Sequence, residues 1–129
     1  MSDINYQYLR PKKEGVLSFS DGDKIKEINL AYRFSYCMAL TEMKLLCVFD
    51  DLGSKHSLEA GKVYDFDGNF CFDIPYPSCL NLGNEIELFF SWCSYSCEGL
   101  NIVFSASKTT VRDFSVVYDL ENRVYSDKE

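Results

Sequence analysis

The sequence contains little of what catalytic sites and membrane spans usually need. It has one histidine, His56, one tryptophan, Trp92, and only three prolines in 129 residues. No run approaches the ~20 consecutive apolar residues that cross a bilayer. The first residues, MSDINYQYLRPKK, hold no apolar stretch of the kind found in a secretory signal. We therefore expect a cytoplasmic protein without a membrane partner.

The single histidine also narrows the choice of enzyme chemistry. A Ser-His-Asp or Cys-His pair would have to use His56, which lies in a polar stretch, and no Gly-x-Ser-x-Gly elbow surrounds a serine. A carboxylate pair for glycoside chemistry could come from Glu85 and Glu87. These two alternate with Ile86 and Leu88, which is typical of the solvent side of a half-buried strand. We expect a protein that is not an enzyme.

Metal-binding patterns are incomplete. Asp65-x-Asp67-x-Asn69 begins like a calcium loop, but the sixth position is Phe70 where glycine is required, and the twelfth is Tyr76 where glutamate is required. Cys93 and Cys97 have no second close pair to complete a zinc site. We expect no metal and no cofactor. The six cysteines (37, 47, 71, 79, 93 and 97) are expected to be reduced thiols, because cytosolic disulfides are uncommon.

The composition favours one all-β domain covering residues 1–129. The chain is long enough to bury a core, and its 47% hydrophobic and 16% aromatic residues favour strands over a helical bundle. Turn signals separate about ten short alternating runs, which predicts a mainly antiparallel sandwich or partly open barrel. Apart from the hairpin described next, the expected strands are residues 4–8, 15–20, 43–49, 63–66, 70–74, 114–118 and 123–125.

The stretch Glu85–Ser107 predicts a β-hairpin at the centre of the fold. Apolar residues alternate along both arms, so one register places them on a common face. That register pairs Trp92 with Leu100, Phe90 with Ile102, and Leu88 with Phe104. We expect Leu88, Phe90, Trp92, Ile102 and Phe104 to be buried together, with the turn between Ser94 and Gly99.

Residues 24–40 fit two patterns. Alternate positions from Ile28 to Leu40 are all apolar or aromatic, which predicts one long strand, bent or bulged. A helical period also fits and would leave Leu30, Phe34 and Met38 on the outer face. The aromatic content favours the strand, and the fold is expected to hold at most one helix, in this region.

Charge is distributed unevenly along the chain. Residues 42–98 hold ten acids and three bases, whereas the remainder holds ten of each, so this segment carries the whole net charge of −7. Tyr64, Tyr76 and Tyr95 lie in the same segment, at positions expected to be exposed. The alternative interpretation is a solvated acidic face that aids solubility. The basic cluster Arg10, Lys12 and Lys13 is too small for a nucleic-acid groove in an acidic chain.

These features favour a non-enzymatic module that binds a basic protein, such as an immunity protein neutralising a nuclease-type toxin. A nuclease must hold phosphates and so presents a basic site, which an acidic surface with aromatic anchors can cover. The predicted partner-binding residues are Tyr64, Asp65, Asp67, Asp73, Tyr76, Tyr95 and Glu98. The alternative is a small-ligand-binding barrel or sandwich, with or without enzymatic activity, whose aromatics line a cavity.

Overall fold

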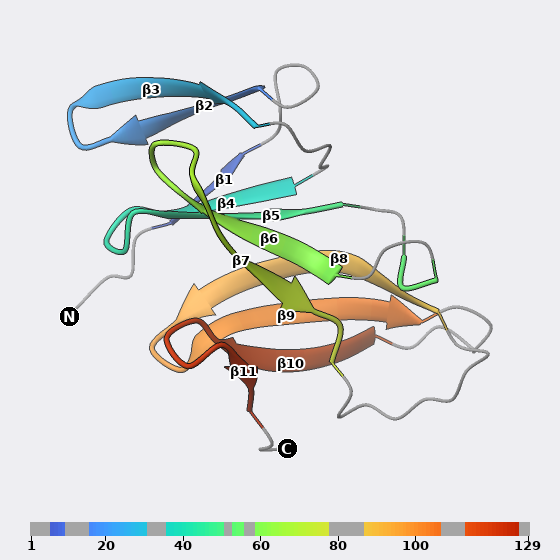
Figure 1. Cartoon of the computed structure of the whole chain (residues 1–129). Coiled ribbons are helices and arrows are strands. Elements are labelled where there is room, and N and C mark those ends of the chain that lie inside the picture. Colours follow the sequence, from blue (N-terminus) through green and yellow to red (C-terminus); the bar gives the residue numbers. More distant parts are fainter. Residues whose placement is uncertain are drawn as a thin grey trace. The chain divides into compact units, whose positions relative to one another are not determined.

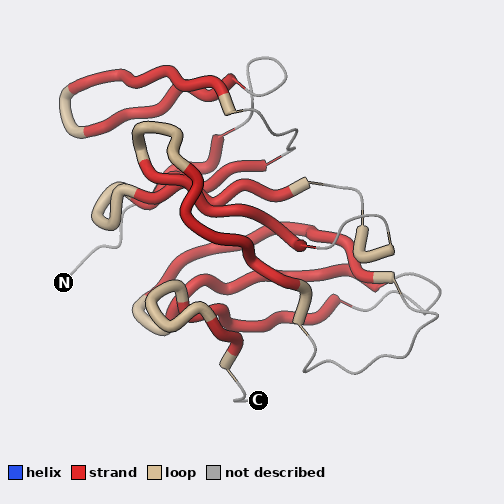
Figure 2. Tube along the Cα trace, viewed as in Figure 1, coloured by secondary structure: helices blue, strands red, loops and turns tan. Residues whose placement is uncertain are grey.

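The computed structural model describes residues 6–9, 16–30, 36–50, 53–55, 59–77, 87–106 and 113–126. These residues form eleven strands and no helix (Figures 1 and 2). Every strand pair whose register is defined runs antiparallel. The predicted all-β, antiparallel fold class is confirmed. Within the described ranges, no helix has the length and apolar character needed to cross a membrane.

The strand boundaries follow the alternating runs of the sequence. They are β1 (Tyr6–Leu9), β2 (Val16–Asp21), β3 (Lys24–Asn29), β4 (Tyr36–Leu40), β5 (Leu45–Phe49), β6 (Glu59–Asp65), β7 (Phe70–Pro75), β8 (Leu88–Ser96), β9 (Gly99–Ala106), β10 (Asp113–Asp119) and β11 (Val124–Tyr125). Ile4 and Gly15, at the ends of two predicted strands, lie outside the described residues.

The chain divides into two compact units. Unit 1 comprises Met1–Asp51 with Gly61–Ile74, and unit 2 comprises Leu52–Ala60 with Pro75–Glu129. The single domain expected over residues 1–129 stays a prediction.

Unit 1 contains a five-stranded sheet in the order β1-β4-β5-β6-β7 and the separate hairpin β2–β3. The hairpin turns at Gly22 and Asp23, where the sequence carries its Asp-Gly signal, and the φ of +67° at Gly22 suits glycine. Pro75 ends β7, as expected of a residue that cannot donate to a ladder.

The core of unit 1 lies between the β2–β3 hairpin and one face of the five-stranded sheet. The hairpin contributes Leu17 and Phe19, and the ring of Phe19 meets that of Phe66 edge-on at 4.7 Å between centroids. Seven further buried residues complete this cluster: Leu30, Cys37, Ala39, Leu46, Val48, Tyr64 and Phe66. Side chains alternate between the two faces of a strand. Cys37 and Ala39 of β4 and Leu46 and Val48 of β5 therefore lie in the same core.

The prediction of one long strand from Ile28 to Leu40 is wrong. The described parts of this region are two strands in different sheets: β3 pairs with β2, and β4 pairs with β1 and β5. The helical alternative is also wrong for the described residues, because 24–29 and 36–40 are both extended. Residues 31–35, between them, lie outside the described part of the chain.

Unit 2 is built on a four-stranded sheet in the order β8-β9-β10-β11. The short segment 53–55 joins its β8 edge, because the amide of Ser54 donates to the carbonyl of Leu88 at 2.8 Å and the amide of Leu88 donates to Ser54 Oγ at 2.9 Å. At the opposite edge, the Tyr125 hydroxyl donates to the carbonyl of Pro75. Unit 2 thus brings together two separate stretches of the chain.

The hairpin β8–β9 forms as predicted, but its register differs. Phe90 faces Phe104, two positions from the expected Ile102, and the turn is tighter, with Ser96 opposite Gly99. The ladder then shifts between Phe90 and Trp92, where Ser91 is an extra residue and the strand has a β-bulge. Phe90 stays in the core at 7% exposed, whereas Trp92 is 50% exposed. The expectation of a buried Trp92 is therefore wrong, while Leu88, Phe90, Ile102 and Phe104 are buried as predicted.

Candidate functional site

The predicted partner-binding residues are divided between the two units. Tyr64, Asp65, Asp67 and Asp73 belong to unit 1, whereas Tyr76, Tyr95 and Glu98 belong to unit 2.

Asp65 caps the turn of the β6–β7 hairpin. Its Oδ1 accepts hydrogen bonds from the amides of Asp67 and Asn69, both at 2.9 Å, and its Oδ2 accepts one from Asn69 Nδ2 at 3.2 Å. These bonds, led by that from the Asn69 amide, hold the pKa of the Asp65 carboxyl below its usual value of 3.8. Asp65, which occupies the first ligand position of the calcium-loop pattern in the sequence, therefore stabilises the turn by accepting these hydrogen bonds.

The other two carboxylates of this hairpin each face a lysine. Lys26 Nζ of β3 lies 2.9 Å from Asp67 Oδ1, and Lys62 Nζ of β6 lies 2.7 Å from Asp73 Oδ1. The bond to Asp67 raises the pKa of Lys26. The negative charge that the sequence concentrates here is thus largely matched by nearby cations, one of them 41 positions away in the sequence.

Tyr64 does not lie in an exposed loop. It is the second-last residue of β6, is only 9% exposed, and belongs to the core of unit 1. Burial raises the pKa of its hydroxyl. The prediction that Tyr64 is an exposed anchor is wrong, because Tyr64 lies opposite Leu46 of β5 and both side chains belong to the core of unit 1.

The three predicted residues of unit 2 occupy different surroundings. Tyr76 is half-buried, with its ring 5.7 Å from that of Phe104. Tyr95 is a half-buried strand residue, opposite the fully buried Leu100. Glu98 is exposed at the tip of the β8–β9 turn. Of the three, only Glu98 is fully available to a partner.

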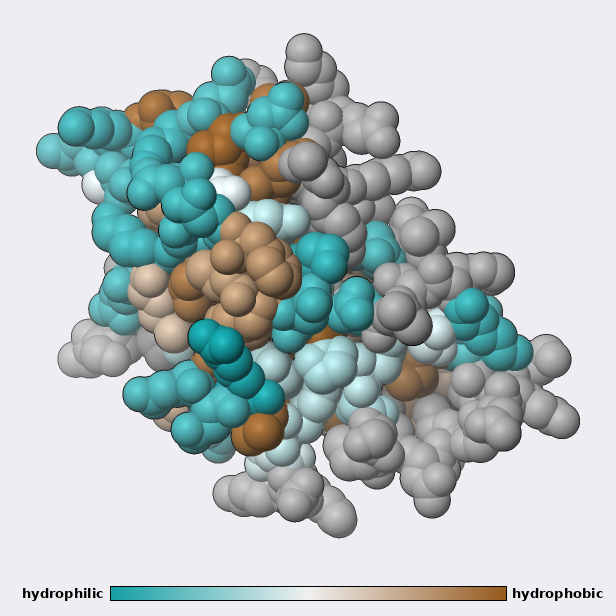
Figure 3. Space-filling model, viewed as in Figure 1, coloured by the Kyte–Doolittle hydropathy of each residue, from teal (hydrophilic) through white to brown (hydrophobic). Residues whose placement is uncertain are grey.

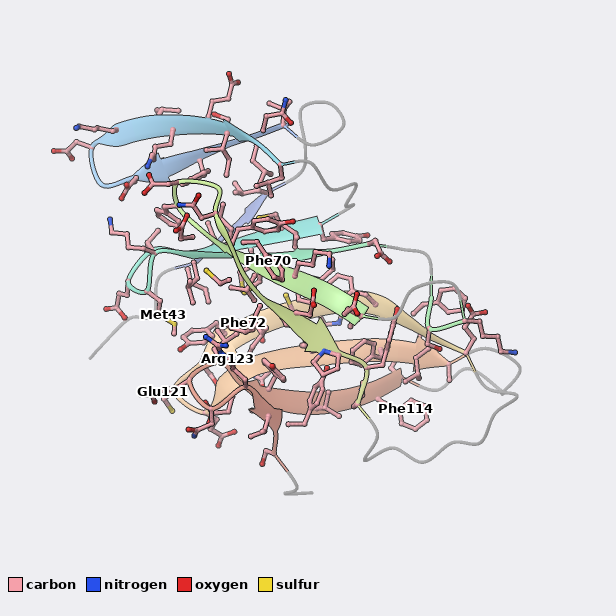
Figure 4. All side chains as sticks on the ribbon, in the orientation of Figure 1. Met43, Phe70, Phe72, Phe114, Glu121 and Arg123 are labelled. Carbon is pink, nitrogen blue, oxygen red and sulfur yellow. The ribbon has the colours of Figure 1, made fainter. Side chains whose placement is uncertain are left out.

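Two exposed aromatic side chains were missed by the sequence analysis, and the first is Phe70. It starts β7 and is 53% exposed. On the face seen in Figure 3, a tan patch lies over β7, where Figure 4 labels Phe70 and Phe72. The Phe70 ring already has neighbours in unit 1: Tyr64 meets it edge-on at 5.7 Å, and Lys62 Nζ lies 5.4 Å from its centroid.

The second is Trp92, on the side of the unit 2 sheet opposite Phe90. Because β8 has an extra residue at Ser91, Trp92 pairs with Val103 and shares the outward face with Phe89, Ser94, Asn101 and Ser115. Nothing in the alternating pattern marks that extra residue, so the exposure of Trp92 could not be read from the sequence.

Charges in the described part of unit 2 are mainly acidic. Two cations, Lys55 and Arg123, accompany six carboxylates: Glu59, Glu87, Glu98, Asp113, Asp119 and Glu121. Glu121 and Arg123 lie in the turn between β10 and β11 (Figure 4). Asp119 caps that turn, and hydrogen bonds from the Asn122 amides lower the pKa of its carboxyl.

Residues considered for catalysis or metal binding are not brought together in the described part of the chain. Those residues hold no cluster of three or more metal-ligating side chains. Cys93 is buried and Cys97 is exposed, so they do not form a common site. Cys37 and Cys47 are buried free thiols and Cys71 is an exposed one. His56, Cys79 and Glu85 lie outside the described residues.

Comparison with known proteins adds no assignment to this geometry. The sequence matches no protein-family profile and no curated protein, and no solved structure matches the chain.

Proposed function

We propose that this chain is a non-enzymatic, acidic protein-binding module whose partner is a basic protein. A stoichiometric inhibitor, such as an immunity protein neutralising a nuclease-type toxin, is the form of this function that we favour. The observation that carries the proposal is the charge of unit 2, in which six described carboxylates accompany two cations. A surface of one sign steers the encounter with a partner of the opposite sign and excludes partners of like sign.

Unit 1 supports the same proposal less strongly. Its β6–β7 carboxylates are matched by Lys26 and Lys62 or are used in a turn. Exposed ion pairs of this kind reduce the field that a distant partner experiences. We therefore assign the attraction of the partner to unit 2, which revises the predicted binding set towards Glu98 and away from Tyr64.

The test is capture of the partner followed by a comparison of charge variants. The full chain is immobilised, exposed to a lysate of its source cells and eluted with increasing salt, and the retained proteins are identified by mass spectrometry. We expect a basic protein whose affinity, measured after purification, falls steeply with ionic strength. A neutral or acidic partner, or an affinity independent of salt, would contradict the proposal.

Two variants with the same net charge distinguish binding to a specific surface from attraction by the overall charge of the chain. One neutralises unit 2 (Glu98→Gln, Asp113→Asn, Glu121→Gln), and the other neutralises exposed acids of unit 1 (Asp23→Asn, Glu27→Gln, Glu42→Gln). We expect the first to slow association and the second to change it little. Equal slowing would show that the chain attracts basic proteins only through its overall charge.

A further inference from the structure

One face of the four-stranded sheet of unit 2 carries exposed and half-buried side chains. We call it the open face and define it by nine residues in three rows across β8, β9 and β10. The rows are Phe89, Ser105 and Asp113, then Trp92, Val103 and Ser115, then Ser94, Asn101 and Val117. Asp113, Ser115 and Trp92 are exposed, whereas Val103 is buried, with 9% of its surface exposed. The opposite face carries the buried residues Phe90, Ile102 and Phe104.

Apolar side chains occupy the β8 side of this face. Trp92 lies directly opposite Val103, and Phe89 stands in the adjacent row on the same strand. A half-exposed tryptophan beside a buried valine offers a large rigid contact area that loses little conformational entropy on binding. Such residues dominate the energetics of protein interfaces.

Polar groups on the rest of the face have fixed positions. Ser105 Oγ donates to Asp113 Oδ1 at 3.0 Å, and Asn101 Nδ2 donates to Ser96 Oγ at 3.2 Å. These bonds orient the groups before any partner arrives, which lowers the ordering cost of association.

Carboxylates outnumber cations on and beside the open face among the described residues. The amide of Lys55 donates to Glu87 Oε2 at 3.1 Å, and the amide of Arg123 donates to the carbonyl of Asp119 at 2.7 Å, so the two described cations of unit 2 lie at the margins of that face. Asp113 lies within it, Asp119 follows Val117 and Tyr118 on the same strand, and Glu87 precedes Phe89 by two positions on the β8 side. Trp92 and Asp113 lie on β8 and β10, with β9 between them, so an extended segment crossing the face can place an apolar group on the ring and an arginine or lysine at the carboxylate.

We infer that the open face is the surface on which the basic partner docks, with Trp92 as its central anchor. This inference rests on the function proposed above and goes further by naming the surface. The expected occupant is a segment that alternates cationic and apolar side chains. Its apolar groups cover Trp92 and Val103, and its cations meet Asp113 and Asp119.

The experiment uses a defined probe, a fluorescein-labelled short peptide of alternating arginine and leucine, and the full chain. Binding is measured by anisotropy at low salt. Emission of Trp92 is recorded in parallel with the unlabelled peptide, and because Trp92 is the only tryptophan the signal comes from this face alone. We expect binding, a blue shift of the emission, and a loss of affinity of about tenfold in Trp92→Ala.

Matched controls come from unit 1. Ile25→Ala removes an apolar side chain that is 72% exposed, and Asp23→Lys reverses an exposed charge. We expect both to bind like the parent chain, whereas Asp113→Lys should weaken binding. The same peptide with glutamate in place of arginine should not bind.

Each other outcome overturns the inference in a recognisable way. If the arginine peptide binds but Trp92→Ala and Ile25→Ala behave alike, the open face is not the docking surface, while capture of basic partners still stands. If the arginine peptide fails to bind, or the glutamate peptide binds equally well, both the surface and the charge argument of the proposed function are wrong. If sedimentation shows a dimer that Trp92→Ala dissociates, the occupant is a second copy of the chain.

Discussion

The β6–β7 hairpin of unit 1 and the β8–β9 hairpin of unit 2 carry similar residues with different outcomes. Each has an exposed aromatic side chain, Phe70 or Trp92, and carboxylates nearby. On β6–β7, Lys26 and Lys62 pair with the carboxylates, and Lys62 also lies over the Phe70 ring. On the open face, the described residues supply no cation. Similar local composition therefore does not decide whether a carboxylate forms an ion pair, because the lysine that pairs with it comes from another strand.

The largest effect should come from two residues of β8 that lie on opposite faces. Phe90→Ala removes a core ring and should lower the free energy of unfolding by about 3–5 kcal/mol. Trp92→Ala removes a larger ring from the open face and should cost under about 1 kcal/mol. Urea denaturation of both variants checks this difference in unfolding free energy. The m-value, which is the slope of that free energy against urea concentration, should be the same for both variants. Similar losses for both would show that Trp92 is part of the core and would remove the contrast between the faces.

A smaller effect should distinguish the closely packed sheet of unit 1 from the open face. A Cβ at Gly61 would lie 2.5 Å from the Val48 carbonyl oxygen and 2.6 Å from the Phe49 ring. Gly61→Ala should therefore cost about 1–3 kcal/mol. Ser115→Val adds more volume on the open face and should change stability by less than about 0.5 kcal/mol. A comparable loss in Ser115→Val would mean that the open face is covered.

The third effect concerns acid. Because hydrogen bonds hold the pKa of Asp65 below 3.8, its contribution to stability is complete above that pH and is lost as the pH falls through the lowered pKa. The Tm of the parent chain should fall more steeply in acid than that of Asp65→Asn. Asp23→Asn, which removes an exposed carboxylate at another turn, serves as control and should follow the parent. Parallel curves for all three would show that the turn does not depend on the Asp65 charge.

The smallest effect should be the coupling between Lys26 and Asp67. The pair is exposed, so a double-mutant cycle with Lys26→Met and Asp67→Asn should show weak coupling at low salt that disappears at high salt. Since the pKa of Lys26 is raised, the coupling should be present below pH 10.5 and be lost as the pH rises through the raised value. Coupling that persists at high salt would show that solvent reaches this ion pair less than the exposure of its two side chains indicates.

The sequence predicted strands better than it predicted surfaces. Alternation located β2, β5, β7, β9 and β10 because a strand repeats every two residues regardless of its partners. It could not separate β3 from β4, because both strands continue the same alternation, although they belong to different sheets. The outward position of Trp92 depends on the bulge that takes Ser91 out of the ladder, and the pairing of Lys26 with Asp67 depends on contacts across 41 positions. Neither feature leaves a local signal in the sequence.

The bulge at Ser91 also affects how this strand can change during evolution. Trp92 points outward and Cys93 inward because Ser91 and Trp92 together occupy one step of the ladder opposite Val103. Deleting Ser91 would leave the faces of both neighbours unchanged, since a regular strand from Phe90 to Trp92 to Cys93 has the same alternation. A change of length by one residue can therefore occur inside this strand without exchanging its two faces. An alignment gap between Phe90 and Trp92 would mark a relative that keeps the same surface without the bulge.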